Sequence, residues 1–418
     1  MRYLRLLRRR DFALLWTGAT LSLLGDGLTW IALVWLVLEL GGGPGAVGVL
    51  VFWYTAPVVI GGLGAGVVLD RFDRRGVLIA DNLVRGLAVA SIPLAATFGQ
   101  VTAPHVLAVA AVYGLLYMLS LAGVPALIPS IVPDDELDTA NAMETVSFGI
   151  GGILGPAVGG LLIGAAGAAT VLALDALSYL AFVACLAGMR GCQPAATAAG
   201  SAGHSVRADL AAALRFVLGQ PTILAITVLF MAFNVGEGVL LVLLPVLARD
   251  VLRVGAEGYG VLAASFTGGL LLGATLVGAV RWPWPLGRSI AAAQLGAGAV
   301  LLALIGASSF AAAALVLAFA GLIASPLTIW AQTIRMRLIP PDMRGRVFAL
   351  LRTTMQSTPP LGGMLGGSLL ALGSVEVAIA AIALLAALPA AVGLVHPALA
   401  ADPAPATALA RPSEPAEP

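Results

Sequence analysis

The chain of 418 residues is 60% hydrophobic and only 10% charged, and its formal net charge is +1. Soluble globular proteins carry roughly 25% charged residues. A water-facing domain cannot hide this much apolar surface, so the composition excludes an ordinary soluble protein. It predicts that most of the chain faces lipid, and we expect no nucleic-acid partner.

Nothing in the sequence supports soluble enzymology. It contains no glycine-rich phosphate-binding loop, no histidine and cysteine cluster with metal-ligand spacing, and no Gly-x-Ser-x-Gly motif. The three histidines, His105, His204 and His396, fall in loops or near predicted helix ends. We therefore expect no enzyme, no cofactor, no metal site and no intrinsic ATP motor.

Long apolar runs dominate the chain. A membrane-spanning helix needs about 20 apolar residues to cross about 30 Å of hydrocarbon. Counting runs between polar or Gly/Pro breaks predicts an all-α membrane protein with twelve transmembrane helices. The predicted helices span residues 12–40, 47–69, 76–98, 103–132, 139–166, 169–190, 221–248, 257–280, 287–306, 309–338, 346–372 and 375–396.

One long polar break, residues 191–220, divides these helices into six and six. We expect an N-terminal six-helix bundle at 1–190, a central loop at 191–220 and a C-terminal six-helix bundle at 221–396. Residues 397–418 are rich in Pro and Ala and predict a disordered tail.

The first residues carry five arginines before an apolar run, which fits either a signal peptide or an uncleaved first helix. No small-x-small cleavage site follows, so an uncleaved helix is favoured. Most arginines lie at the helix ends that share a side with the N-terminus, and the opposite ends hold only Arg249 and Arg253. This bias predicts that both termini and the central loop are cytoplasmic.

Few charges fall within the hydrocarbon, away from the ends of the predicted helices, and each costs at least about 2.5 kcal/mol at the membrane centre. They are Asp26, Asp81, Arg85, Glu144, Asp175, Glu237 and Arg352. Each of them is therefore a functional candidate.

Two of these acids, Asp26 and Glu237, lie near the middle of a helix between two glycines that allow close backbone approach. A low dielectric disfavours the charged form of a carboxylate, so either acid could exchange a proton near neutral pH. Asn234, on the face of Glu237, could hydrogen-bond that acid or a substrate. Alternatively, both acids only make packing hydrogen bonds or cap helix breaks.

A short charged loop, Gly66-Val-Val-Leu-Asp70-Arg71-Phe-Asp-Arg74-Arg75, joins helices 2 and 3. Cations are favourable near the unpaired carbonyls at the carboxyl end of a helix. A carboxylate such as Asp70 is unfavourable there unless a positive group pairs with it. The motif fits either a gate or a plain positive anchor. The following acids can pair with Arg74 or Arg75: Asp134, Asp135, Glu136 and Asp138.

Helices 3, 4 and 10 carry polar and aromatic groups at helical spacing. Asp81 and Arg85 are four residues apart, which predicts a local ion pair. Asp175 in helix 6 is expected to be a structural hydrogen-bond partner. A further set could form an aromatic, sparsely polar wall that binds amphipathic molecules, although an aromatic stripe more often serves packing: Trp30, Tyr113, Tyr117, Ser120, Thr328 and Gln332.

Helix 5 contains Gly151-Gly-Ile-Leu-Gly155-Pro156-Ala-Val-Gly159-Gly160. The glycines leave one face without bulk, so close helix packing and a bend at Pro156 are expected. A generic small-residue packing face is the alternative.

The loop motif and the helix 5 motif together resemble two signatures of the major facilitator superfamily, the second typical of its drug and proton antiporters. The patterns Leu24-Gly25-Asp26, Leu174-Asp175-Ala176 and the segment 244–252 are similar to the branch with macrolide efflux pumps and the enterobactin exporter. The resemblance covers about residues 10–396. It implies two pseudo-symmetric six-helix bundles with helices 1, 4, 7 and 10 around a central cavity, and a monomer in a bacterial inner membrane.

For individual residues, the resemblance implies that Asp26 and Glu237 lie on the transport path. It implies that Asp70 reaches the amino end of helix 11, which carries Arg344, Arg346 and, deeper, Arg352. It makes helix 5 a hinge against helix 8. Helix 4 lacks the Arg-x-x-Gln-Gly motif that many proton antiporters use for proton transfer, which leaves the coupling route open.

The two halves resemble each other internally. Offsets of 211 and 208 align helix 1 with helix 7 and helix 5 with helix 11. The offset of 208 sets Glu144 opposite Arg352. We therefore predict two symmetric ion-pair latches between the halves, Glu144 with Arg281 and Arg352 with Asp70.

The sequence thus predicts a proton-driven exporter of small amphipathic organic molecules. Alternatives are a dedicated exporter of one native metabolite, such as a siderophore or antibiotic, and an uptake permease. A protein of another class, a non-coupled receptor or lipid-moving protein, also remains open.

Overall fold

The computed structural model describes residues 2–190, 206–277, 284–340 and 343–400. Within these ranges the chain is helical and has no strand. The first half consists of α1 (Arg2–Leu7), α2 (Arg10–Glu39), α3 (Pro44–Arg71), α4 (Arg74–Thr97), α5 (Ala103–Ile131), the short η1 (Asp134–Glu136), α6 (Leu137–Ala166) and α7 (Ala168–Gly188).

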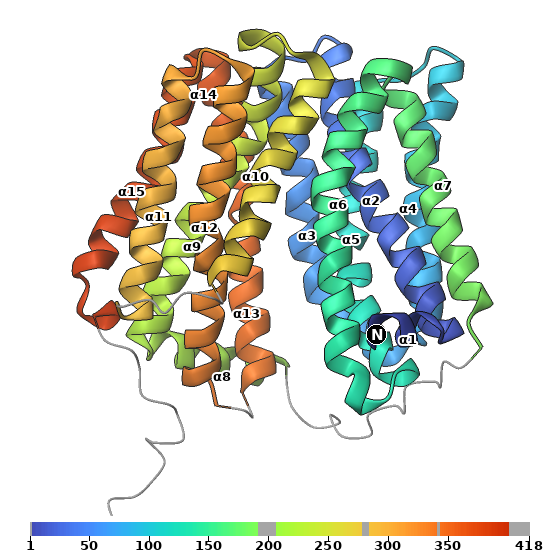
Figure 1. The fold of residues 1–418 in the computed structure, drawn as a ribbon, viewed down its shortest axis with the longest axis horizontal. Coiled ribbons are helices and arrows are strands. Elements are labelled where there is room, and N and C mark those ends of the chain that lie inside the picture. Colours follow the sequence, from blue (N-terminus) through green and yellow to red (C-terminus); the bar gives the residue numbers. More distant parts are fainter. Residues whose placement is uncertain (1, 191–205, 278–283, 341–342, 401–418) are drawn as a thin grey trace, which may run out of the picture.

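The second half begins with α8 (Val206–Leu218) and continues through α9 (Pro221–Val246), η2 (Leu247–Val251), α10 (Gly255–Val277), α11 (Leu286–Leu302), η3 (Ala303–Gly306), α12 (Phe310–Leu338), α13 (Arg344–Gln356), α14 (Pro359–Leu372), α15 (Val375–Val395) and η4 (Pro397–Leu399). Figure 1 shows the two halves side by side, with the N-terminus and α8 at the same end of the bundle. We call this end the terminal side.

Eleven of the described helices are long and apolar enough to cross a membrane. The twelfth predicted helix, 346–372, is broken into α13 and α14. The break follows from Pro359 and Pro360, which have no N–H to donate to the carbonyls of Met355 and Gln356 one turn earlier. Together, α13 and α14 supply the twelfth crossing.

Helices of each half pack mainly with one another. In the first half α2 packs on α6 and α7, and α3 packs on α5; in the second, α10 packs on α12 and α9 packs on α14 and α15. Two extensive contacts join the halves, α6 with α10 and α3 with α14. The chain therefore forms the expected pair of six-helix bundles.

The glycines of α6 use two adjacent faces. On the face toward α2, a Cβ atom at Gly155 would lie 2.8 Å from the Cα of Gly27, so only glycine permits this approach. On the face toward α10, a Cβ atom at Gly160 would lie 3.1 Å from the Cα of Gly260. The predicted contact of helix 5 with helix 8 is thus present, and a second contact within the first half accompanies it.

The same arrangement recurs in α14, where Cβ atoms at Gly362 and Gly367 would meet the Cα atoms of Gly238 and Gly48 at 2.8 and 3.0 Å. By these contacts Gly362 corresponds to Gly155 and Gly367 to Gly160, an offset of 207 rather than the predicted 208. One residue turns a helix by about 100°. Carried down the helix, the offset of 207 sets Glu144 against Leu351, so the predicted equivalence with Arg352 does not follow from the packing.

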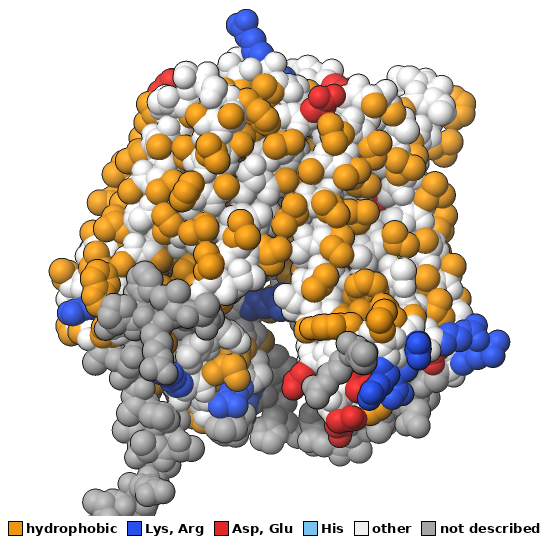
Figure 2. Space-filling model, in the orientation of Figure 1, with side chains coloured by type: hydrophobic (Ala, Val, Ile, Leu, Met, Phe, Trp, Pro, Cys, Tyr) orange, Lys and Arg blue, Asp and Glu red, His pale blue; other side chains and the backbone are white. Residues whose placement is uncertain are grey.

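The outer surface is apolar in its middle belt, as Figure 2 shows, with charged side chains gathered near the ends. Large hydrophobic side chains such as Leu63, Leu87 and Leu388 are well exposed there. So much contiguous exposed apolar surface fits contact with lipid rather than water.

Two polar segments contain more structure than expected. Part of the predicted loop 191–220 forms α8, whose Ala213 and Val217 are buried against the second half. The predicted tail begins with η4, where Leu399 is fully buried and Thr222 donates a hydrogen bond of 2.9 Å to the Ala398 carbonyl. Residues 401–418 lie outside the described residues.

Candidate functional site: a buried ion cluster and a basic cavity

A fully buried arginine, Arg85 of α4, lies at the centre of the first half. Its Nη2 is 2.8 Å from Asp81 Oδ2 and its Nε is 3.1 Å from Asp81 Oδ1, a two-pronged ion pair along one helix turn. Its Nη1 is 3.4 Å from Asp26 Oδ1 of α2. The predicted Asp81–Arg85 pair is therefore present, and it extends to a second acid that the sequence did not connect to it.

Neutral donors complete this ion cluster, which we define as Asp26, Asp81 and Arg85. The Tyr179 hydroxyl of α7 donates to Asp26 Oδ1 at 2.6 Å. Ser120 of α5 donates to Asp81 Oδ2 at 2.5 Å and accepts from Arg85 Nη2 at 2.6 Å. Four helices thus supply hydrogen bonds to three charges, as burial of charge requires.

Aromatic rings cover the cluster on one side. The Arg85 guanidinium carbon lies 4.8 Å from the Tyr179 ring centre and 5.6 Å from the Tyr113 ring centre, within cation–π range. Tyr113 stacks on Tyr54 and Tyr117, with centroid separations of 4.9 and 6.1 Å. Trp30 contacts Tyr54 edge-on at 4.7 Å.

The predicted face of α5 therefore divides into three roles. Tyr113 is 1% exposed and packs in the core. Ser120 bonds the ion cluster. Tyr117 lines two pockets, both of which also reach Asp26.

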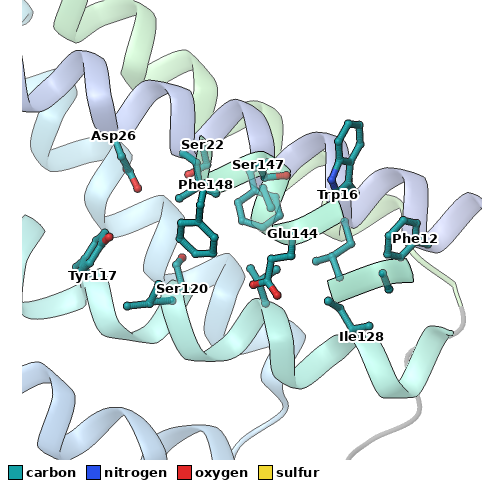
Figure 3. Close-up of a pocket in the computed structure, with 17 residues that line it drawn as sticks. Phe12, Trp16, Ser22, Asp26, Tyr117, Ser120, Ile128, Glu144, Ser147 and Phe148 are labelled. Atoms are coloured by element: carbon teal, nitrogen blue, oxygen red, sulfur yellow. The ribbon is translucent and has the colours of Figure 1, made fainter. Parts of the chain in front are cut away.

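Asp26 differs from the other charges of the cluster in its exposure. Its side chain is 13% exposed, whereas those of Asp81 and Arg85 are fully buried. One pocket beside it, of about 40 Å³, runs between α2, α5 and α6. Figure 3 shows the labelled side chains of Asp26, Ser120 and Glu144 around this pocket. A second pocket, of about 230 Å³, is bounded by Trp30 and Pro156.

Asp175, also fully buried, accepts hydrogen bonds from Thr29 and Ser178. This is the structural hydrogen-bond role expected for it.

The second half places its acid differently. Glu237 lines a separate pocket of about 20 Å³ with Phe233 and Phe266. Within the described part of the chain it has no ion-pair partner.

Asn234, for which the sequence suggested a hydrogen bond to Glu237 or to a substrate, donates to the Met355 carbonyl at 3.0 Å in this conformation. Pro359 has no N–H to donate to that carbonyl, which instead accepts hydrogen bonds from Asn234 and from the Thr358 hydroxyl, the latter at 2.8 Å.

Thr328 and Gln332 line a cavity of about 640 Å³ between the halves. Its wall on the second half includes Arg335, Arg352 and Gln356, and its wall on the first half includes apolar residues of α3 and α5. We call it the basic cavity. Figure 2 shows a hollow between the halves on the terminal side, with basic side-chain atoms at its upper edge.

The predicted gate residues are in part bound elsewhere. Arg74 donates to the Ala126 carbonyl of α5 and Arg75 to the Ala187 carbonyl of α7, each at 2.8 Å. These bonds anchor the loop at helix ends, where a cation is favourable. The acids of the next loop were expected to pair with these arginines, but Glu136 pairs with Arg9 at 2.9 Å.

Asp70 and Arg352 form no ion pair in this conformation of the described residues. Glu144 lines the pocket of Figure 3, and its predicted partner Arg281 lies outside the described residues. Arg71 of α3 and Arg346 of α13 are exposed. The latch pairs therefore stay predictions.

Sequence reasoning missed Tyr179, Arg335 and the contact between Arg85 and Asp26. The sequence feature that could have indicated the Arg85–Asp26 contact is that the predicted membrane helices of the first half contain one arginine and several acids. A lone arginine at membrane depth needs counter-charges, but sequence spacing showed only the partner on its own helix.

The family described as transmembrane secretion effector matches residues 3–415. The chain belongs to this family of the major facilitator superfamily. Relatives of this chain include the multidrug efflux pump Tap of Mycolicibacterium fortuitum, 25% identical over 86% of this chain and 87% of that protein. Macrolide efflux protein A of Streptococcus pyogenes is 22% identical, covering 84% and 87% respectively.

Solved structures share the fold of this chain. The nucleoside transporter NupG superposes with a TM-score of 0.72 at 12% identity, covering 92% of this chain and 98% of that one. A bacterial homologue of the human lysosomal transporter Spinster, inward-facing and occupied, gives 0.72 at 14% identity, covering 91% and 95%. At such identities the likeness establishes the major facilitator fold alone.

Proposed function

We propose that this protein exports small amphipathic organic molecules across a bacterial inner membrane by proton antiport. Two of its relatives, the multidrug pump and the macrolide pump, are efflux proteins. The terminal side is then cytoplasmic, in line with the placement of the arginines. The observation that carries the coupling is the position of Asp26, bonded to a buried arginine and bordering two pockets.

The charges of the ion cluster suggest how a proton is held. With both acids ionised, Asp26, Asp81 and Arg85 sum to −1, and one bound proton makes the cluster neutral. Asp81 keeps two short contacts to Arg85, while Asp26 keeps one of 3.4 Å and is the acid with access to a pocket. Asp26 is therefore the acid that takes and releases the proton.

We propose that Arg85 takes the part of the arginine that the fourth transmembrane helix lacks. Arg85 lies on α4, which is the third transmembrane helix. It contacts Asp26 of α2 and Ser120 of α5, the fourth transmembrane helix. We propose that loss of the Asp26 proton strengthens the Asp26–Arg85 pair, and that protonation frees Arg85 to be neutralised by Asp81 alone. The two arrangements supply a two-state element that a proton gradient can bias.

Alternating access would use the contacts between the halves. The close approaches of Gly160 to Gly260 and of Gly48 to Gly367 lie near the helix ends opposite the terminal side, whereas the basic cavity lies toward it. We assign this arrangement to a cytoplasm-facing state. In the opposite state the predicted Arg352–Asp70 latch would close the cytoplasmic side.

The test is accumulation of a fluorescent amphipathic drug in inverted membrane vesicles, with and without an imposed proton gradient. Gradient-driven accumulation supports export by antiport. Equal accumulation with and without the gradient indicates a protein that is not coupled to protons. Gradient-driven loss of drug from preloaded vesicles indicates an uptake permease. A vesicle preparation without the protein is the control.

A further inference from the structure

A buried arginine without an acidic partner lines the basic cavity. Arg335 of α12 is 5% exposed, its Nε has no hydrogen-bond partner, and no carboxylate among the described residues pairs with it. Its recorded contacts are a weak one from Nη2 to the Met355 sulfur at 3.3 Å and a cation–π contact with Phe230 at 5.1 Å. Neither neutralises the charge, and an isolated buried charge is strongly unfavourable.

Polar side chains extend from Arg335 along two helices. Thr328, Gln332 and Arg335 follow one another on one face of α12 at spacings of four and three residues. Arg352 and Gln356 do the same on α13. Among the described residues, none of those that line this cavity is acidic. The wall on the second half therefore offers two guanidinium groups and several neutral donors, and it has an excess of positive charge.

The opposite wall is apolar. Val58, Gly62 and Ala65 of α3 and Met118 and Ala122 of α5 line it. A cavity of about 640 Å³ is in the size range that holds an organic ligand of drug size. Its two walls match a molecule that has an apolar body on one side and an anionic group on the other.

We infer that Arg335, with Arg352, forms an anion-binding subsite of the basic cavity, and that its ligands are amphipathic anions carrying a carboxylate, sulfonate or phosphate. A guanidinium binds such oxyanions through paired N–H groups, and Arg335 Nε lacks the partner that this geometry would supply. The inference rests on the proposed transport function for its biological meaning, but binding itself needs no proton gradient.

The anion has two conceivable sources. Arg335 is three residues from the end of α12, about 4.5 Å along the axis. A soluble amphipathic anion entering from the terminal side could reach it, and so could the headgroup of an anionic phospholipid. Both share the chemistry of an oxyanion on an apolar body.

The experiment compares two probes with the same apolar body. Binding of naphthalene-2-sulfonate and of uncharged naphthalene-2-sulfonamide is measured by equilibrium dialysis on the full chain in phosphatidylcholine nanodiscs. The sulfonate should bind at least about tenfold more tightly, since a charge-assisted hydrogen bond in a buried site contributes that much. Arg335→Gln should remove the preference, and Arg352→Gln, at an exposed residue, should reduce it by a smaller factor.

Arg337→Gln is the matched control, because it removes the same charge from the same helix end at an exposed position outside the cavity lining. Equal affinity for the two probes, or an equal loss in Arg337→Gln and Arg335→Gln, would overturn the inference. Asp26→Asn should keep the sulfonate preference even if it abolishes coupling, so failure of the antiport proposal and failure of the subsite are distinguishable.

Native mass spectrometry separates the two sources. The wild-type chain and Arg335→Gln are purified with phosphatidylglycerol present. A phospholipid retained by the wild-type chain and lost from the variant identifies a lipid headgroup at the subsite. If neither chain retains it while the sulfonate preference holds, the ligand is a soluble amphipathic anion.

Discussion

The two buried arginines of this protein have opposite surroundings. Arg85 in the first half has two carboxylates, a serine and two aromatic rings around it. Arg335 in the second half has one aromatic ring and one thioether. The difference teaches that burial alone does not define a role. A satisfied buried charge belongs to an internal network, whereas an unsatisfied one is open to a ligand.

The two arginines should differ most in their contribution to the free energy of unfolding. Arg85→Leu leaves Asp26 and Asp81 buried without their cation, and should lower the free energy of unfolding by about 3–5 kcal/mol. Arg335→Leu removes a charge that has no acidic partner, so it should be neutral or stabilising. Thermal unfolding of both variants in the same detergent measures this. Equal destabilisation would mean that Arg335 has a counter-charge after all.

Transport should depend more strongly on the ion cluster around Arg85 than on the surroundings of Arg335. Asp26→Asn keeps the size of the side chain but cannot release a proton, so gradient-driven export should fall by about a hundredfold, while the unfolding temperature changes little. Asp175→Asn is the control, because that acid is bonded to Thr29 and Ser178 rather than to arginine. Wild-type export with unchanged pH dependence in Asp26→Asn would contradict the assignment.

Glu237 tests whether the second half has a coupling acid of its own. It has no arginine partner in the described residues and faces a small separate pocket. Glu237→Gln should therefore lower export only a few-fold, with substrate affinity affected as much as the pH profile. Drug titrations at several pH values measure both effects. A loss as large as that of Asp26→Asn would make the halves functionally alike.

The smallest effect is expected at the gate. If Asp70 meets Arg352 only when the terminal side closes, Asp70→Asn should weaken that closed state by about a kcal/mol or less, the range of a partly exposed pair. Maleimide labelling of a cysteine introduced at Thr328, on the cavity wall, should then rise about twofold. A matched rise for Asp73→Asn, whose side chain caps α4 through Gly76, would show a loop effect instead of a latch.

The helix count and most helix bounds could be predicted because lipid demands long apolar runs. The break at Ser357 could have been read from Pro359 and Pro360, yet the apolar run across it concealed the interruption. The internal repeat could be recognised in the sequence, but the predicted offset between the halves was wrong by one residue. Glycines spaced by four and by five residues align equally well at offsets of 207 and 208. Only the backbone contacts of Gly155 and Gly362 select the offset of 207.

By itself the sequence determined the membrane class, the twelve crossings, the six-plus-six division and the identity of Asp26 as a candidate acid. Those properties depend on local composition and on the high cost of charge in hydrocarbon. Tertiary structure alone decided which charges meet. Arg85 joins Asp26 across 59 residues, while Arg335 meets no acid among the described residues. Side chains on different helices come together through packing and rotation, which no spacing along the chain records.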